Sequence, residues 1–221
     1  KVEDNTKINV FAMPYESNFS GKIYKKEYIN LIKKKYGENT IFLLDTAKYI
    51  STNEVDLSDN IVDIATISFY KIFGYPTGIG ALIVKKSIIP YIKNKEYFGG
   101  GTVTAVSADN DFIVARDKIY EWLEDGSQNY LGIITLEKSL NITDLKSYDV
   151  SIMTYYFYDK IRELTYSNNQ KIFELYDIPL NYNFQTFNEN HGSIITFNLF
   201  KSDGSYIGYK EFEKVSALHN I

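Results

Sequence analysis

The 221-residue sequence contains no cysteine, and Arg116 and Arg162 are its only arginines. The absence of cysteine excludes disulfides, thiolate metal sites and a sulfur nucleophile within these residues. No apolar run has the length of a membrane-spanning helix, and the first residues do not resemble a signal peptide. The net charge is −4, which gives no basic footprint for nucleic acid or an anionic membrane. We therefore expect neither partner.

The two histidines, His191 and His219, lie far apart in the sequence. Neither has a neighbour at the spacing of a metal site or of a catalytic triad, so we predict no metal site. The remaining composition is that of a globular protein, with 44% hydrophobic residues in a chain long enough to bury a core.

Short apolar runs alternate with helical patterns in the first part of the chain. Tyr24–Tyr36 has helical spacing and stops at Gly37, and a polar connection follows at Asp56–Ser58. This alternation predicts an α/β fold with a mainly parallel sheet, in which ligands lie at the carboxyl ends of the strands. The predicted buried strands are Ile8–Met13, Ile41–Leu44, Ile64–Phe69 and Ala81–Val84.

The pattern changes in the second part of the chain. Helices are predicted for Leu131–Leu140, Ser151–Tyr166 and Phe212–Leu218, and a strand for Ser193–Phe200, with a turn at Asp203-Gly204; residues 105–120 are ambiguous. We expect residues 1–130 to form part of a large domain. Residues 131–221 would supply a linking helix and part of a smaller α/β domain.

Lys71 and Asp45 are the candidate chemical residues. Each follows a strand-like run, and burying a charge at a strand end is unfavourable unless the charge has a partner. An amine and a carboxylate at neighbouring strand ends suggest a pyridoxal 5′-phosphate (PLP) site. Lys71 would bind the cofactor as a Schiff base and Asp45 would contact its ring nitrogen. The alternatives are a lysine that extends to solvent and an aspartate that caps a turn.

Several strings resemble the class V, fold-type I PLP enzymes, the cysteine desulfurase-like group. The longer strings resemble one branch of that group, the molybdenum cofactor sulfurases of eukaryotes. They occur in the family's order over nearly the whole chain. The strings are Ser17-Asn18-Phe19-Ser20-Gly21, Leu43-Leu44-Asp45-Thr46-Ala47, Ser68 to Gly80, Tyr97-Phe98-Gly99-Gly100-Gly101-Thr102 and Glu124-Asp125-Gly126-Ser127.

The resemblance implies further cofactor contacts. Asn18 resembles the residue that bonds the ring hydroxyl, with a turn-forming asparagine as the alternative. Ser68 and Tyr70 would contact the phosphate, although many relatives have histidine where Tyr70 stands. Thr102, in the glycine turn Gly99-Gly100-Gly101-Thr102, would lie near the same phosphate, with a plain loop as the alternative. Ser127 resembles a threonine that reaches the cofactor of the neighbouring subunit, which implies a homodimer.

The resemblance also implies a reaction. Sulfur would be taken from L-cysteine as a protein persulfide, leaving alanine, and passed to the molybdenum cofactor in the cytoplasm. Two alternatives remain: a general cysteine desulfurase or selenocysteine lyase, and a non-catalytic dimerising scaffold. Because the persulfide cysteine and the arginine for the substrate carboxylate have no counterpart here, we expect the chain to be a fragment that is inactive alone.

Overall fold

The computed structural model describes residues 8–37, 39–73, 78–142 and 147–221. The chain forms two compact units, each built from segments that are distant in sequence. The first unit comprises Lys1–Met13, Glu27–Ala47 and Asp56–Asp144, and the second comprises Pro14–Lys26, Lys48–Val55 and Leu145–Ile221. The predicted division into a large and a small domain at residue 130 remains a prediction.

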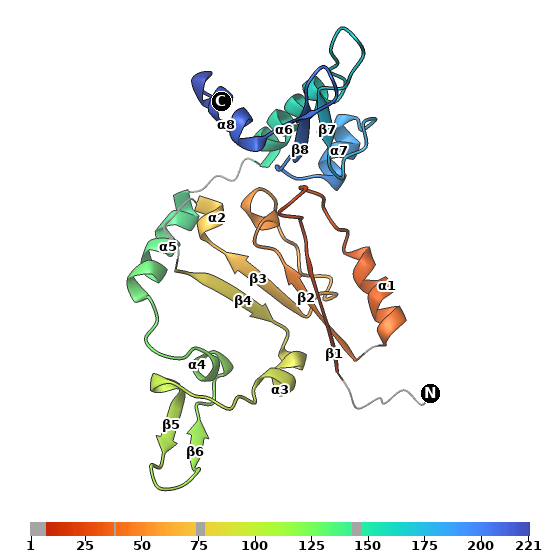
Figure 1. Cartoon of the computed structure of the whole chain (residues 1–221). Coiled ribbons are helices and arrows are strands. Elements are labelled where there is room, and N and C mark those ends of the chain that lie inside the picture. Colours follow the sequence, from red (N-terminus) through yellow and green to blue (C-terminus); the bar gives the residue numbers. More distant parts are fainter. Residues whose placement is uncertain (1–7, 38, 74–77, 143–146) are drawn as a thin grey trace. The chain divides into compact units, whose positions relative to one another are not determined.

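The first unit is organised around a four-stranded sheet of order β1-β2-β3-β4 (Figure 1). Strands β2 and β3 are parallel, whereas β4 is antiparallel to β3, so the sheet is mixed. The other strands and helices are short and follow along the chain. The elements of this part are β1 (Asn9–Pro14), α1 (Glu27–Tyr36), β2 (Thr40–Asp45), β3 (Ile64–Ser68), α2 (Tyr70–Phe73), β4 (Gly80–Val84), α3 (Ile89–Ile92), β5 (Val103–Val106), β6 (Ile113–Ala115), α4 (Ile119–Leu123) and α5 (Tyr130–Ile142).

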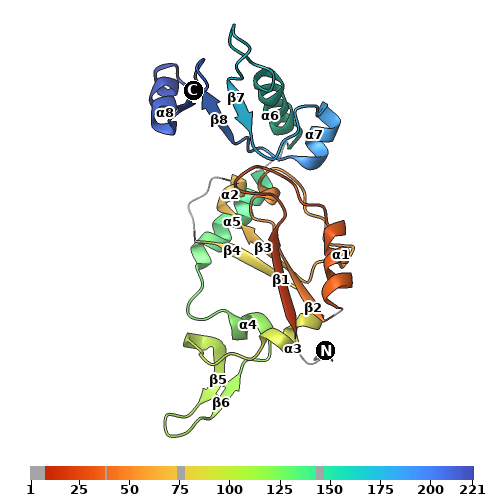
Figure 2. The same cartoon turned by 45° about the vertical axis from the view of Figure 1, so that its right-hand side comes forward.

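The core of the first unit lies around strand β2. Five of the six β2 residues are apolar or threonine and four are buried, as expected of a strand covered on both faces. Helix α1 lies beside β2 (Figure 2) and contributes the fully buried Ile29. The helix ends at Gly37, whose φ of +93° is the left-handed conformation that favours glycine after a helix.

Asp63, just before β3, is a buried acid that joins three elements. Its carboxylate accepts hydrogen bonds from the Lys33 ammonium at 2.9 Å, the Lys85 ammonium at 3.1 Å and the Phe42 amide at 2.9 Å. Burial alone would raise the pKa of Asp63, but these hydrogen bonds outweigh it and lower that pKa below its usual value. The acid thus ties α1 and β2 to the start of β3.

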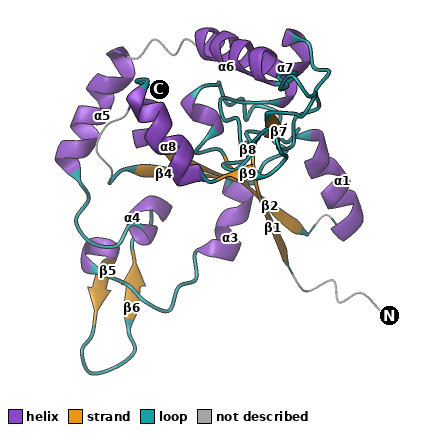
Figure 3. Cartoon of the chain, turned by 45° about the horizontal axis from the view of Figure 1, so that its top comes forward, coloured by secondary structure: helices purple, strands orange, loops and turns teal. Residues whose placement is uncertain are grey.

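The second unit contains an antiparallel sheet of order β7-β8-β9. Its core is formed by Tyr158, Ile178 and Phe187, and the Tyr158 hydroxyl donates to the Pro179 carbonyl at 2.6 Å. Figure 3 distinguishes these helices and strands by colour. The elements are α6 (Ser147–Ile161), β7 (Phe173–Leu175), α7 (Phe184–Asn190), β8 (Phe197–Phe200), β9 (Tyr206–Ile207) and α8 (Tyr209–Leu218).

Several predicted elements are confirmed with shifted ends. Helix α1 begins at Glu27 rather than Tyr24, α6 ends at Ile161 rather than Tyr166, and β8 begins at Phe197 rather than Ser193. The prediction of a buried first strand was wrong, because β1 is largely exposed and Val10 is 68% exposed. No helix in the described part of the chain is both long and apolar enough to span a bilayer.

Candidate active site

Asp45 and the segment that leads to Lys71 meet at one edge of the sheet. Because β2 and β3 are parallel and Asp45 pairs with Thr66, both strands end at the same edge. Ser68 is the last residue of β3, and Lys71 follows within the short helix α2. This is the edge at which an α/β sheet binds its ligand.

The Asp45 carboxylate is held by one of its two oxygens. Oδ1 accepts hydrogen bonds from the Ala47 amide at 3.0 Å and from the Thr66 hydroxyl at 3.1 Å. Thr46, which lies between Asp45 and Ala47 in the sequence, donates its own hydroxyl to the Thr66 carbonyl at 2.6 Å. Within the described residues no hydrogen bond or ion pair reaches Oδ2. A half-buried carboxylate with one anchored oxygen and one available oxygen is suited to hold a cationic ring nitrogen.

Lys71 lies three residues beyond the end of β3, so it is a helical residue and not the last residue of a strand. Its side chain is half-buried, as is that of Ser68, whereas Tyr70 is 42% exposed. The part of the predicted motif at residues 74–77 lies outside the described residues. Strand β3 therefore ends at Ser68, and Tyr70 and Lys71 follow it within a single helical turn.

The glycine turn and the Ser127 loop meet in a second group of residues. The Gly99 amide donates to Oδ1 of Asp125 at 2.8 Å, and the Gly126 amide donates to the Gly99 carbonyl at 3.4 Å. A β-carbon on Gly100 would lie 3.1 Å from the α-carbon of Gly126, and both glycines have positive φ. Glycine at position 100 thus allows the close approach, and the positive φ at both positions favours glycine.

The predicted residues Thr102 and Ser127 fall in this second group. The Thr102 side chain is buried, and its hydroxyl donates to the Gly99 carbonyl at 3.1 Å, so it closes the turn. Ser127 is exposed. Sequence reasoning gave Asp125 no role, yet the Lys95 ammonium contacts it at 2.7 Å. This hydrogen bond is the main cause that lowers the pKa of Asp125.

Asn18 lies in the second unit, in the turn predicted from its string. The turn forms because the Ser17 hydroxyl accepts hydrogen bonds from the amides of Phe19 and Ser20, at 3.2 and 3.1 Å. Asn18 is exposed at its tip. Its role toward a cofactor remains a prediction.

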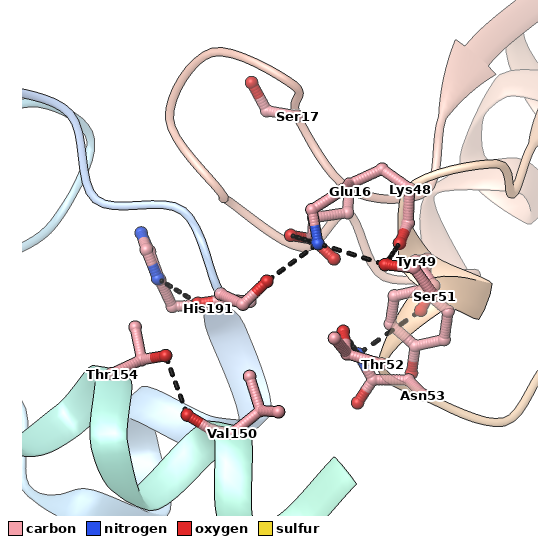
Figure 4. Close-up of polar contacts among 12 residues, drawn as sticks. Glu16, Ser17, Lys48, Tyr49, Ser51, Thr52, Asn53, Val150, Thr154 and His191 are labelled. Atoms are coloured by element: carbon pink, nitrogen blue, oxygen red, sulfur yellow. Dashed lines mark hydrogen bonds and ion pairs between the residues drawn. The ribbon is translucent and has the colours of Figure 1, made fainter. Parts of the chain in front are cut away.

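Sequence reasoning missed a buried ion pair in the second unit. Lys48 Nζ lies 3.2 Å from Oε1 of Glu16, whose side chain is fully buried (Figure 4). The same ammonium donates to the hydroxyls of Ser193 at 2.8 Å and Ser51 at 3.3 Å. Lys48 therefore joins three segments of the chain. The sequence pattern gave no indication of this ion pair, because the partners of Lys48 lie up to 145 positions away.

Two titratable rings of the second unit have shifted pKa values. Burial is the main cause that raises the pKa of Tyr49 to about 12, followed by the neighbouring Tyr15 and Glu16. His191 is 3% exposed, and its two ring nitrogens face the carbonyls of Ser20 and Gly192 at 2.7 and 2.9 Å. Burial lowers the pKa of His191, although those two carbonyls and Asp177 oppose the shift.

The residues at the β2–β3 edge fit PLP by their chemistry. Lys71 supplies a primary amine, Asp45 an available carboxylate oxygen, and Ser68 a hydroxyl two residues from the register pair Asp45–Thr66. The turn at Gly99–Thr102 and the loop at Ser127 form the separate group described above. Amine, acid and hydroxyl are the groups that a phosphorylated pyridine aldehyde requires.

Comparison with known proteins identifies the family and the fold of the chain. A curated relative named molybdenum cofactor sulfurase, from Bombyx mori, is 36% identical over 95% of this chain. An apo cysteine desulfurase of Thermococcus onnurineus NA1 has the same fold, with a TM-score of 0.66 and 22% identity over 96% of this chain. A variant of C-DES with glycine covalently linked to its PLP cofactor superimposes with a TM-score of 0.70 at 13% identity, over 96% of this chain.

The chain spans only part of these proteins: 28% of the Bombyx mori relative, 48% of the desulfurase and 52% of C-DES. The solved structures identify the fold as the fold type I of PLP-dependent enzymes, as the resemblance implied. The sequence matches the aminotransferase class-V family over residues 2–209. The chain therefore belongs to the aminotransferase class-V family.

Proposed function

We propose that this chain is the PLP-binding part of an enzyme that takes sulfur from L-cysteine and sulfurates the molybdenum cofactor. The observation that carries the proposal is the placement of Asp45 and Lys71 at one edge of the parallel pair β2 and β3. The relatives named molybdenum cofactor sulfurase support the choice of sulfur acceptor. The whole reaction would yield alanine and a sulfurated cofactor.

Lys71 would hold the cofactor and afterwards move a proton at the α-carbon of the substrate. PLP, when bound, supplies the electron sink for the carbon–sulfur chemistry. Asp45 would keep the ring nitrogen protonated, because an adjacent negative charge stabilises the cationic form. The Thr66 hydroxyl and the Ala47 amide would orient Asp45 by holding its Oδ1.

The remaining predicted residues would bind the cofactor without chemical roles. Ser68, Tyr70 and Ser127 would donate hydroxyls to the phosphate, and Asn18 would contact the ring hydroxyl. We further propose that Ser127 acts on the neighbouring subunit of a homodimer. The thiol that receives the sulfur must come from outside these residues, because they contain no cysteine.

Borohydride reduction of the chain incubated with PLP, followed by peptide mass spectrometry, tests the central assignment. We expect a pyridoxyl group on Lys71 and none in Lys71→Ala. Lys86→Ala is the matched control, because Lys86 lies in the same unit beyond β4. Modification elsewhere, or equal modification of all exposed lysines, would contradict the proposal.

The solved desulfurases favour a second candidate, a general cysteine desulfurase. The two functions differ in their sulfur acceptor. In the complete enzyme, transfer of sulfur from L-cysteine to the molybdenum cofactor supports the first function. Release of alanine with sulfur delivered only to reductants or to other proteins supports the second.

A further inference from the structure

A cavity of about 390 Å³ lies in the first unit, lined by Lys93, Lys95, Arg116, Asp117 and Trp122 among others. Its walls come from the end of α3, the strand exit of β6 and helix α4, and none of the predicted PLP contacts lines it. The cavity is large enough for a small molecule rather than a bare ion. It therefore needs an explanation apart from the site at Lys71.

The positive charge of the cavity exceeds its negative charge. Lys93, Lys95 and Arg116 face Asp117 as the only acidic residue of the lining. Lys95 is neutralised by Asp125 at 2.7 Å, but no ion pair engages Lys93 or Arg116 within the described residues. Two cations from different elements, accompanied by one carboxylate, favour an anionic ligand.

The cationic walls are held in place by fixed contacts. The Trp122 indole donates to the Lys93 carbonyl at 2.5 Å, and the Lys95 ammonium lies 4.5 Å from the centre of the indole ring. Arg116 donates from Nε to the Gly101 carbonyl at 2.7 Å. This bond uses only Nε of Arg116, so it leaves the terminal guanidinium nitrogens available to a ligand.

We propose that this cavity binds a small phosphorylated ligand, with its phosphate between Lys93 and Arg116. Guanidinium and ammonium groups are the side chains that bind phosphate, and the cavity has room for the organic part beside Trp122. The inference does not depend on the proposed function. Arg116 and Lys95 also link the cavity to the Gly99–Thr102 turn, through Gly101 and through Asp125 and Gly99.

The structure provides its own reporter, because Trp122 is the single tryptophan of the 221 residues and lines the cavity. Titration of the PLP-free chain with pyrophosphate, at constant ionic strength, should change the Trp122 emission in a saturable manner. Inorganic phosphate forms the second arm. Tighter binding of pyrophosphate would identify a phosphoester-sized ligand, and equal binding would identify a single phosphate as the recognised group.

Lys93→Gln is the diagnostic variant, since Lys93 is exposed and no ion pair engages its ammonium in the part of the chain that the structure describes. It should weaken pyrophosphate binding by about tenfold, as expected for one charge-assisted contact. Lys118→Gln removes the same charge from a lysine that pairs with Glu121 and does not line the cavity. The affinity of this variant for pyrophosphate should therefore be unchanged. Arg116→Gln should lose affinity in the same way as Lys93→Gln.

Calorimetry of the unmodified chain gives a second readout of pyrophosphate binding that does not depend on the emission of Trp122. Unchanged melting temperatures show that the variants fold. A linear emission change that does not saturate, or equal weakening in Lys93→Gln and Lys118→Gln, would overturn the proposal. So would calorimetry that detects no pyrophosphate binding.

Discussion

A β-carbon on Gly192 would lie 2.2 Å from Oε1 of Glu16, closer than any real contact of that kind. Glycine at position 192 therefore makes room for the buried carboxylate that Lys48 neutralises. The Gly192 amide also donates to the Gly21 carbonyl at 2.7 Å, which fixes its backbone. The ion pair and the chain around it consequently cannot shift independently.

Gly192→Ala should destabilise the fold by about 1–3 kcal/mol, the usual effect of inserting a methyl group into a packed site. Urea unfolding of the chain measures the change. Gly208→Ala is the control, because a β-carbon there meets nothing within 4 Å and only the preference for glycine before α8 is lost. Equal stability of the two variants would show that Glu16 can move aside.

Lys48→Met should destabilise the fold by about 3–5 kcal/mol, because it leaves the Glu16 carboxylate buried without its ammonium. Lys201→Met removes an equal charge from an exposed lysine and should have little effect. The double variant Glu16→Gln/Lys48→Met should recover part of the loss, measured by the same urea unfolding. No recovery would mean that Lys48 acts through Ser193 and Ser51 rather than through charge.

The stability of the fold should fall as the pH drops below about 6.5, the ordinary pKa of histidine. Burial lowers the pKa of His191 in the folded state, so over this range the unfolded chain binds a proton that the folded chain does not. The groups that face the ring are the carbonyls of Ser20 and Gly192, Asp177 and the Phe187 ring. The slope cannot exceed about 1.4 kcal/mol per pH unit for one group.

Urea unfolding between pH 7.5 and 5 (roughly the histidine range) measures this slope, and His191→Gln should remove it. Asp63 has its pKa lowered, so its contribution is present above the ordinary aspartate value and is lost only at lower pH. The pH ranges over which His191 and Asp63 change the stability of the fold are therefore separate. A gain in stability on acidification to pH 5 would mean that the two carbonyls hold His191 as a cation.

Asp45→Asn in the complete enzyme should still bind PLP but should release alanine more slowly. The amide no longer favours a protonated ring nitrogen, and each unit of pKa lost there is worth about 1.4 kcal/mol, or about tenfold in rate. Thr66→Val is the matched variant, since it removes only one of the two hydrogen bonds to Oδ1 of Asp45, and its effect should be smaller. Turnover of Asp45→Asn equal to that of the unmodified enzyme would make Asp45 structural.

Local patterns were sufficient for most of the first unit. The apolar run of β2, the stop at Gly37 and the run that ends at Ser68 were each visible in neighbouring residues. Their side-chain chemistry at the strand ends also followed, because parallel strands end together. The Asp45 and Lys71 edge was thus predictable from short stretches.

Contacts between distant segments were not predictable in this way. The β5–β6 hairpin is exposed, with Phe112 at 54% and Val106 at 53%, so no alternation of buried and exposed residues marked it. The Asp125–Gly99 contact and the Glu16–Lys48 pair need the folded chain to bring their partners together. The cavity at Trp122 has the same origin.

The second unit also constrains the order of events during synthesis. Lys48 leaves the ribosome 145 residues before Ser193 does, and the first segment of the unit leaves earlier still. At usual elongation rates this delay is roughly 7–30 s. Until then the early segments await the helices and strands that cover them. A ribosome pause after Lys48 would therefore prolong the exposure of Glu16 to water, whereas a pause just before Ser193 would delay only the contact that Ser193 makes with Lys48.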